Sequence, residues 1–393
     1  MEPETQTQGT ESNGSSVAKT AVWLVLLIIV VGGLIFYGSK KSGEEEAAPK
    51  EPIKIGFIGP LTGDAANMGQ NAQAAVAIAV AEVNTAGGIN GRMLEVIYED
   101  GKCNGKDAAN AANKLINIDK VPVILGGACS GETSAFTGAA EQAKVTVLSY
   151  CSSAPTITQA GDYIFRNYPS DLYQGAFGAD YIYTTLGKKK VAILYVKSDW
   201  GVGIKDVFLE KYKALGGTIV AEEGYEQTAR DLRTNLTKIK SANPEAVYFL
   251  GYTEASIPGL KQAKELGLKA ILFGGDAWDD SKIWTEVGEA GEGAMYSVVS
   301  APLNDKFKTD MKAKVGSDEI AVCTPTAYDA LKILASVLGK VEATGEAIKN
   351  ELYRTVYTGG VSAAEVKFDA NGDMVGANYA VKTVKTGKAE VVQ

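Results

Sequence analysis

The most constraining feature of the sequence is an alternation of short apolar runs with helical segments, which occurs in two series between residues 53 and 273. In the first series, predicted strands at 53–58, 93–99, 121–125 and 145–148 are separated by predicted helices at 69–86, 107–118 and about 132–143. The second series has predicted helices at 173–186, 202–215, 231–241 and 256–266, with strands at 191–196, 218–223, 246–250 and 270–273. Strands that alternate with helices of about 10 to 15 residues indicate parallel sheets with right-handed crossovers. Two series therefore predict an α/β protein with two doubly wound parallel-sheet lobes.

The C-terminal part adds three predicted helices, at 305–314, 325–338 and 347–356, and strand-like runs at 295–299, 365–368 and 378–383. The segment from Asp369 to Asp373 contains Asn371 and Gly372, residues typical of tight turns. We therefore expect a hairpin that joins the last two runs.

Composition excludes several classes of function. The net charge is −8 and the basic residues are spread along the chain, so nucleic acid is not an expected partner. The chain has no histidine, which removes Ser-His-Asp and Cys-His catalysis and most zinc sites. The segment Gly127–Gly131 resembles a nucleophile elbow around Cys129, but no histidine is present to activate the thiol. We therefore expect that the protein is not an enzyme, that it has no catalytic residue, and that it binds no metal or cofactor.

The N-terminal region suggests a membrane anchor. Residues 1–18 are polar and predict a disordered tail, and 39–52 predict a charged linker. The run 21–37 has no charged residue and reaches about 17 residues, the lower limit for a membrane-spanning helix. We therefore expect a transmembrane anchor at 19–38, with a cleaved signal peptide as the alternative. The lysines around this run, Lys19 before it and Lys40 and Lys41 after it, do not favour an external position for the main domain.

The four cysteines, Cys103, Cys129, Cys151 and Cys323, show no Cys-x-x-Cys spacing. Four cysteines allow three pairings, and the sequence does not choose between these and free thiols.

The loops that follow the predicted strands are the expected ligand sites, because ligands of open α/β sheets bind beyond the carboxyl ends of the strands. The best defined is the stretch 121–135, where an apolar strand, Gly126-Gly127 and a helix start form a corner of free backbone N–H groups around Ser130. The polar and aromatic candidates on these loops are Ser130, Ser152, Ser153, Trp200, Tyr252 and Asp276.

These candidates suit a zwitterion. The first series supplies donors, so Ser130 and Ser153 are expected to bind a carboxylate. The second series supplies rings and an acid, so Asp276 and the Tyr252 hydroxyl are expected to bind an ammonium group. Charge-assisted hydrogen bonds of about 1.5 to 3 kcal/mol each give micromolar binding when four or five act together.

At this point the residues show a family resemblance. The sequence resembles the Leu/Ile/Val-binding proteins of branched-chain amino-acid ABC transporters over essentially 52–385. The resemblance is carried by Ile-Lys-Ile-Gly-Phe-Ile-Gly-Pro-Leu-Thr-Gly, Glu-Val-Asn-Thr-Ala-Gly-Gly-Ile-Asn-Gly-Arg, Tyr-Glu-Asp-Gly-Lys-Cys, Gly-Ala-Cys-Ser-Gly-Glu-Thr, Ser-Tyr-Cys-Ser-Ser-Ala-Pro, Asp-Trp-Gly-Val-Gly and Thr-Ala-Tyr-Asp-Ala-Leu.

The resemblance implies a type I periplasmic-binding fold, in which two lobes are joined by three crossover segments and close on a ligand. One lobe is then 52–169 with 299–375, and the other is 170–298 with 376–393. The family's disulfide matches Cys103 and Cys129. Cys151 and Cys323 lie outside the family pattern, and we hypothesise that they form a second bridge beside the cleft.

The resemblance also assigns roles. Ser130 matches the serine that binds the ligand carboxylate, and Cys151 and Ser153 match a backbone-and-hydroxyl pair. Trp200 and Tyr252 match rings that close from the other lobe, and Asp276 matches a longer glutamate that pairs with the ammonium. Met68 stands where the family often has an aromatic residue.

We therefore expect an extracytoplasmic, membrane-tethered, monomeric solute-binding protein. It captures a small amino acid, with leucine, isoleucine or valine as the leading candidates, and presents it to an ABC permease. Two alternatives remain: a ligand-sensing receptor domain that acts through a partner chain, and a binder of an amide such as urea.

Overall fold

The structure is a computed structural model that describes residues 1, 3, 16–40, 50–317 and 320–392. It consists of two units, Met1–Lys50 and Glu51–Gln393, which are described separately. The predicted tail at 1–18 lies largely outside the described residues, as does most of the predicted linker at 39–52.

The first unit contains the helix α1, Ser16–Lys40. Among the described residues, no helix combines the length and the apolar character that crossing a bilayer requires. The prediction of a transmembrane anchor at 19–38 is therefore wrong.

The second unit begins with a five-stranded parallel sheet of order β2-β1-β3-β4-β5. Its strands are β1 Ile53–Gly59, β2 Leu94–Asp100, β3 Val123–Gly126, β4 Thr146–Ser149 and β5 Ile164–Arg166. The helices between them are α2 Ala66–Thr85, α3 Gly105–Asn117 and α4 Ser130–Ala143, and α3 packs against α4.

Both faces of this sheet are buried, which explains why its strands are continuous apolar runs. Neighbouring residues along a strand point to opposite faces. Phe57 and Leu125 accordingly belong to a different apolar cluster from Ile58 and Ile124, which pack with residues of α3 and α4.

The second sheet has seven strands in the order β14-β13-β10-β9-β8-β6-β7. Its parallel part comprises β6 Lys190–Val196, β7 Thr218–Tyr225, β8 Ala246–Leu250, β9 Ile271–Gly274 and β10 Met295–Val299. The strands β13 Tyr379–Lys385 and β14 Lys388–Val391 extend it in antiparallel fashion. Its helices are α5 Asp171–Asp180, α6 Asp199–Ala214, α7 Arg233–Ser241, α8 Thr253–Glu265 and α9 Ser281–Val287.

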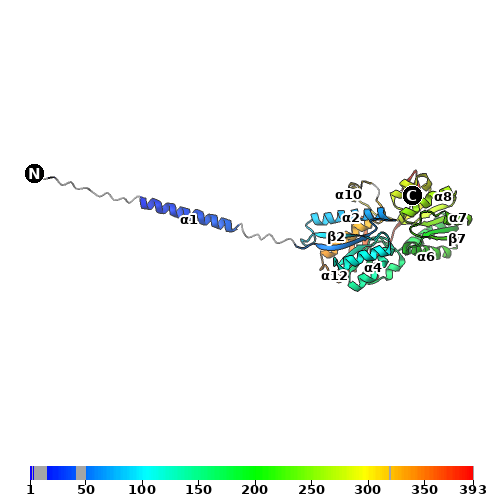
Figure 1. Ribbon diagram of the computed structural model, residues 1–393, viewed down its shortest axis with the longest axis horizontal. Coiled ribbons are helices and arrows are strands. Elements are labelled where there is room, and N and C mark those ends of the chain that lie inside the picture. The colour runs from blue at the N-terminus through cyan, green and yellow to red at the C-terminus, as the bar shows by residue number, and fades with distance from the viewer. Residues whose placement is uncertain (2, 4–15, 41–49, 318–319, 393) are drawn as a thin grey trace. The chain divides into compact units, whose positions relative to one another are not determined.

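The chain passes between the two sheet regions three times: between β5 and β6, after β10, and between β12 (Glu365–Lys367) and β13. After β10 come α10 Asp305–Val315, α11 Thr324–Leu338 and α12 Gly345–Leu352, and both α10 and α11 pack against α2. In Figure 1, β2, α2, α4 and α12 accordingly lie in one lobe, whereas β7, α6, α7, α8 and the C-terminus lie in the other. The exact predicted lobe boundaries stay predictions.

The predicted C-terminal hairpin forms only around its turn, where Phe368 and Met374 form an antiparallel bridge and the Val375 N–H donates to the Lys367 carbonyl oxygen at 3.0 Å. The strand β12 Glu365–Lys367 pairs with β11 Val356–Thr358, and β13 pairs with β10 and β14. The turn itself is present, since the Asp369 carboxylate accepts hydrogen bonds from the backbone N–H groups of Asn371 and Asp373. The local turn therefore forms, and long-range sheet pairing decides the partners of the strands on either side of it.

Candidate ligand-binding site

A small pocket, about 300 Å³ including space open to solvent, lies where the carboxyl ends of strands from both sheets face each other. We call it the ligand pocket; its lining residues are Met68, Ala128, Cys129, Ser130, Cys151, Ser153, Trp200, Tyr252, Asp276, Ala277, Val322 and Cys323.

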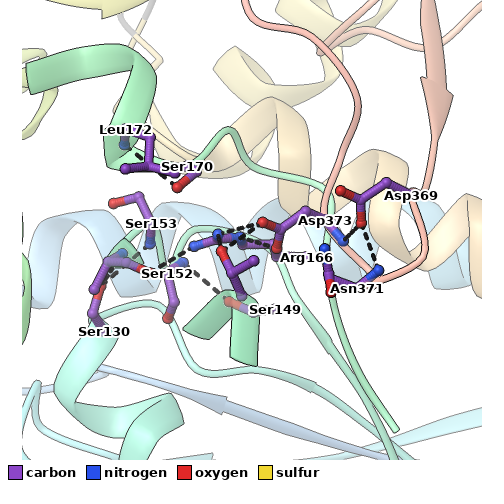
Figure 2. Close-up of polar contacts among 12 residues, drawn as sticks. Ser130, Ser149, Ser152, Ser153, Arg166, Ser170, Leu172, Asp369, Asn371 and Asp373 are labelled. Carbon is purple, nitrogen blue, oxygen red and sulfur yellow. Dashed lines mark hydrogen bonds and ion pairs between the residues drawn. The ribbon is translucent and has the colours of Figure 1, made fainter. Parts of the chain in front are cut away.

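The first sheet contributes an anion-binding corner. Ser130 is the first residue of α4 and follows β3, so its backbone N–H belongs to the group at a helix start that has no intrahelical partner. The Ser130 Oγ accepts hydrogen bonds from the N–H groups of Ser153, at 3.2 Å, and of Ala154, at 3.1 Å (Figure 2). Because both lone pairs of this oxygen are engaged, its O–H is left to donate. A hydroxyl donor at a helix N-terminus suits a carboxylate.

Glu132 holds the loop that carries Ser130. Its carboxylate accepts from the backbone N–H of Cys103, at 2.9 Å, and from those of Ala128 and Cys129, at 2.9 and 3.0 Å. The Cys103–Cys129 disulfide joins the same two segments. Burial raises the pKa of Glu132 to about 7, against the opposing effect of these hydrogen bonds.

A buried ion pair supports the corner from behind. The guanidinium of Arg166, at the end of β5, binds the Asp373 carboxylate through Nε at 2.6 Å and Nη2 at 2.7 Å (Figure 2). Its Nη1 donates to the carbonyl oxygen of Ala154 at 2.8 Å. Because the N–H of Ala154 donates to Ser130, Arg166 positions the corner without reaching the pocket.

The second sheet contributes two stacked rings. Trp200 lies in the first turn of α6, after β6, and Tyr252 precedes α8, after β8. Their ring centroids are 4.9 Å apart with an interplanar angle of 27°. Both rings are buried in the pocket wall, where they offer flat apolar area to a ligand side chain.

Asp276, after β9, supplies the acid. It is 4 % exposed, and its Oδ2 accepts a hydrogen bond from the Tyr168 hydroxyl at 2.6 Å. Burial raises the pKa of Asp276, while hydrogen bonds from Tyr168 and Gln174 act in the opposite direction.

Asp171 is a second acid next to the pocket, and sequence reasoning missed it. Its backbone N–H donates to the carbonyl oxygen of Ser153 at 2.8 Å. Neither carboxylate oxygen makes a hydrogen bond of ordinary geometry with the described residues. Burial and then the charge of Asp276 raise its pKa well above the usual value. The sequence feature that would have identified Asp171 is strand β5. If this strand had been predicted, the loop after it, with Tyr168 and Asp171 at its end, would have been a candidate ligand loop.

Hydrogen bonds near the pocket join the first-sheet region to the second. Asn67 Nδ2, in α2, donates to Asp280 Oδ1 at 2.7 Å. Gln227 Nε2 donates to the carbonyl oxygen of Cys103 at 3.0 Å, and Arg230 pairs with Asp64. These contacts hold the pocket closed.

The structure brings together seven of the eight predicted ligand-binding residues, namely Met68, Ser130, Cys151, Ser153, Trp200, Tyr252 and Asp276. Ser152 does not line the pocket, because its hydroxyl is bonded to the carbonyl oxygens of Gly127 and Ala128 and to Thr133. Both expected disulfides, Cys103–Cys129 and Cys151–Cys323, are present.

Two α/β sheet regions, linked by three chain crossings and closed over a small pocket with polar groups at its ends, define a two-lobed solute-binding protein. Comparison with known sequences gives the family: residues 52–389 match the model of the periplasmic binding proteins, so the chain belongs to that family.

Similar proteins point the same way. The chain is 30 % identical over 339 residues to the leucine-, isoleucine-, valine-, threonine- and alanine-binding protein of Pseudomonas aeruginosa, an alignment that covers 84 % of this chain and 89 % of that protein. The crystal structure of a leucine-binding protein from Thermotoga maritima is similar, with a TM-score of 0.80, 29 % identity and coverage of 87 % of this chain and 98 % of that one. The isoleucine complex of a branched-chain amino-acid transporter substrate-binding protein from Streptococcus pneumoniae gives a TM-score of 0.79, 29 % identity and coverage of 87 % and 99 %.

These similarities confirm the resemblance to the Leu/Ile/Val-binding proteins and the type I periplasmic-binding fold. They also confirm that the chain is a solute-binding protein and not an enzyme. Family membership agrees with the expected extracytoplasmic location.

Proposed function

We propose that the protein captures an amino acid with a small aliphatic side chain between its lobes and delivers it to an ABC permease. The observation that carries the proposal is the separation of charge-binding groups within one closed pocket. Donors at Ser130 and Ser153 come from the first sheet, and the Asp276 carboxylate comes from the second.

The ligand carboxylate lies in the corner at Ser130, where the hydroxyl and the backbone N–H groups at the start of α4 donate to it. Its ammonium group lies against Asp276. Its side chain packs against Trp200, Tyr252 and Met68. Each charged end thus meets a buried partner of opposite character, which offsets its loss of water.

Closure completes the site. The carboxylate binds to the first lobe, and Trp200, Tyr252 and Asp276 meet the ligand when the second lobe closes. The names of the similar proteins support a branched-chain ligand, since they bind leucine, isoleucine and valine. They also support a permease as the partner, since one belongs to a branched-chain amino-acid transporter.

A calorimetric panel tests the proposal. The purified protein is titrated with L-valine, L-leucine, L-isoleucine, L-glutamate and urea. We expect micromolar or tighter binding of at least one branched-chain amino acid and none of urea, because an amide leaves Asp276 without a cation. Binding of urea alone would assign the pocket to amides, and no binding of any amino acid would reject the proposal.

A further inference from the structure

The ligand pocket shares a wall with a second, larger cavity. Val322 and Cys323 line both spaces. The second cavity measures about 1340 Å³, including space open to solvent, and apolar side chains such as Tyr296, Val298 and Leu303 contribute to its lining. Only a thin layer of the chain therefore separates a small closed site from a much larger one.

A disulfide forms the core of this wall. Cys151, after β4, is bonded to Cys323, which directly precedes α11, and the two Cα atoms are 5.4 Å apart. Both residues line the ligand pocket. The Met68 Sδ lies 3.8 Å from the Cys151 Sγ, so three sulfur atoms make one apolar end of the pocket.

The wall is held at several points and has little freedom to move aside. The Cys323 backbone has a φ of +65°, and its carbonyl oxygen accepts hydrogen bonds from Ala327 N–H and Thr326 Oγ1. The N–H of Val322 donates to the carbonyl oxygen of Asp279 at 3.0 Å. Both neighbours in the wall are thus anchored through their backbones as well as by the disulfide.

We propose that the Cys151–Cys323 disulfide sets the maximum size of the ligand side chain, admitting branched aliphatic amino acids and rejecting aromatic ones. Without this wall the ligand pocket joins the neighbouring cavity, and a longer side chain fits. This inference rests on the proposed function, because it takes the ligand to be an amino acid whose charged ends are held at Ser130 and Asp276.

Packing energetics support the size limit. Forcing extra carbon atoms into a well-packed site costs about 1 to 3 kcal/mol when the surroundings are rigid. A single methylene in an apolar pocket already changes selectivity by about 10- to 200-fold. A phenyl ring directed at a fixed disulfide is therefore strongly disfavoured relative to an isopropyl group.

The test compares L-valine with L-phenylalanine by calorimetry on the oxidised wild type and on the double variant Cys151→Ala, Cys323→Ala. We expect the wild type to bind valine at least about 100-fold more tightly than phenylalanine. In the double variant this ratio should fall at least about tenfold, chiefly because phenylalanine binds better.

A second variant covers the case in which the double variant does not fold. Val322→Ala thins the same wall and leaves both disulfides intact, so the ratio should again fall, by about threefold or more. The matched control is Val145→Ala, which shortens an equally buried valine that lines neither cavity. Its ratio should equal that of the wild type.

The outcomes are distinct. If the wild type binds phenylalanine as tightly as valine, or if the ratio is unchanged in every folded wall variant, the size limit is refuted while valine binding still upholds the proposed function. If the wild type binds neither amino acid, the proposed function fails and the size limit fails with it.

Discussion

Arg166 and Asp373 lie 207 residues apart in the sequence and form a two-point ion pair beneath the anion-binding corner. The Arg166 side chain is completely buried. Through the Ala154 carbonyl oxygen it orients the backbone segment whose N–H groups donate to Ser130. A segment close to the C-terminus therefore shapes a binding corner built by β3 and β4.

Replacing Arg166 by Met should reduce the free energy of unfolding by about 3 to 5 kcal/mol, because it leaves the Asp373 carboxylate without its cation. Urea unfolding at fixed pH measures the loss. The control is Lys197→Met, in the exposed pair with Glu226, which should change stability by less than about 1 kcal/mol. Equal effects of the two variants would show that the buried pair does not support the fold.

Asp276→Ala should weaken binding of the preferred amino acid far more than Met68→Ala. The first variant strands a desolvated ammonium group, a loss of about 2 to 5 kcal/mol or roughly 30- to several-thousand-fold in Kd. The second removes only apolar contact and should weaken binding by about tenfold or less. Calorimetry on both variants measures the difference, and similar losses would argue against the proposed ligand orientation.

Asn67→Ala should weaken ligand binding by about 3- to 10-fold without a direct contact to the ligand. The Asn67 side chain joins α2 to Asp280 after β9, so its loss removes this hydrogen bond of the closed form together with the one that Asn67 Oδ1 accepts from Asn71 within α2. The control is Asn113→Ala, since the Asn113 side chain bonds within α3 alone. Unchanged affinity of Asn67→Ala in calorimetry would mean that this contact does not contribute to closure.

The sequence predicts the strands that are buried on both faces, because each of them is a continuous apolar run. The run 53–58 becomes β1 and 246–250 becomes β8. The sequence does not predict strand β5, because it has only three residues and ends in the charged Arg166. The burial of Arg166 depends on its ion pair with Asp373, which lies far along the chain. The expected C-terminal hairpin forms only at its turn for a related reason, since the partners of β12 and β13 are determined by sheet pairing far along the chain.

The candidate site likewise contains residues that the sequence predicts and residues that it does not. The loops after the recognised strands carry Ser130, Trp200 and Asp276, and the structure places all three in one pocket. Tyr168 and Val322 come from segments that pass between the sheets, and no local pattern places such segments beside a pocket. The sequence therefore identifies site residues that lie at the ends of predicted strands. Site residues on the crossing segments are found only from the three-dimensional fold.

Glu132 makes the stability of the protein dependent on pH. Its folded pKa of about 7 lies above the ordinary value of 4.5, so the folded state binds more protons than the unfolded state between these values. The stability that this group contributes is fully present below about pH 4.5 and is lost as the pH rises through 7. The loss amounts to at most about 3.5 kcal/mol, because each pKa unit corresponds to about 1.4 kcal/mol.

The variant Glu132→Gln isolates this effect, since glutamine stays neutral at every pH. Urea unfolding of both proteins between pH 4.5 and 8 gives the difference in free energy of unfolding, wild type minus variant. We expect this difference to fall as the pH rises. The other buried acids, Asp171, Asp276 and Asp329, titrate in both proteins and largely cancel. A difference that stays constant with pH would show that Glu132 keeps an ordinary pKa, with its three backbone hydrogen bonds fully offsetting its burial.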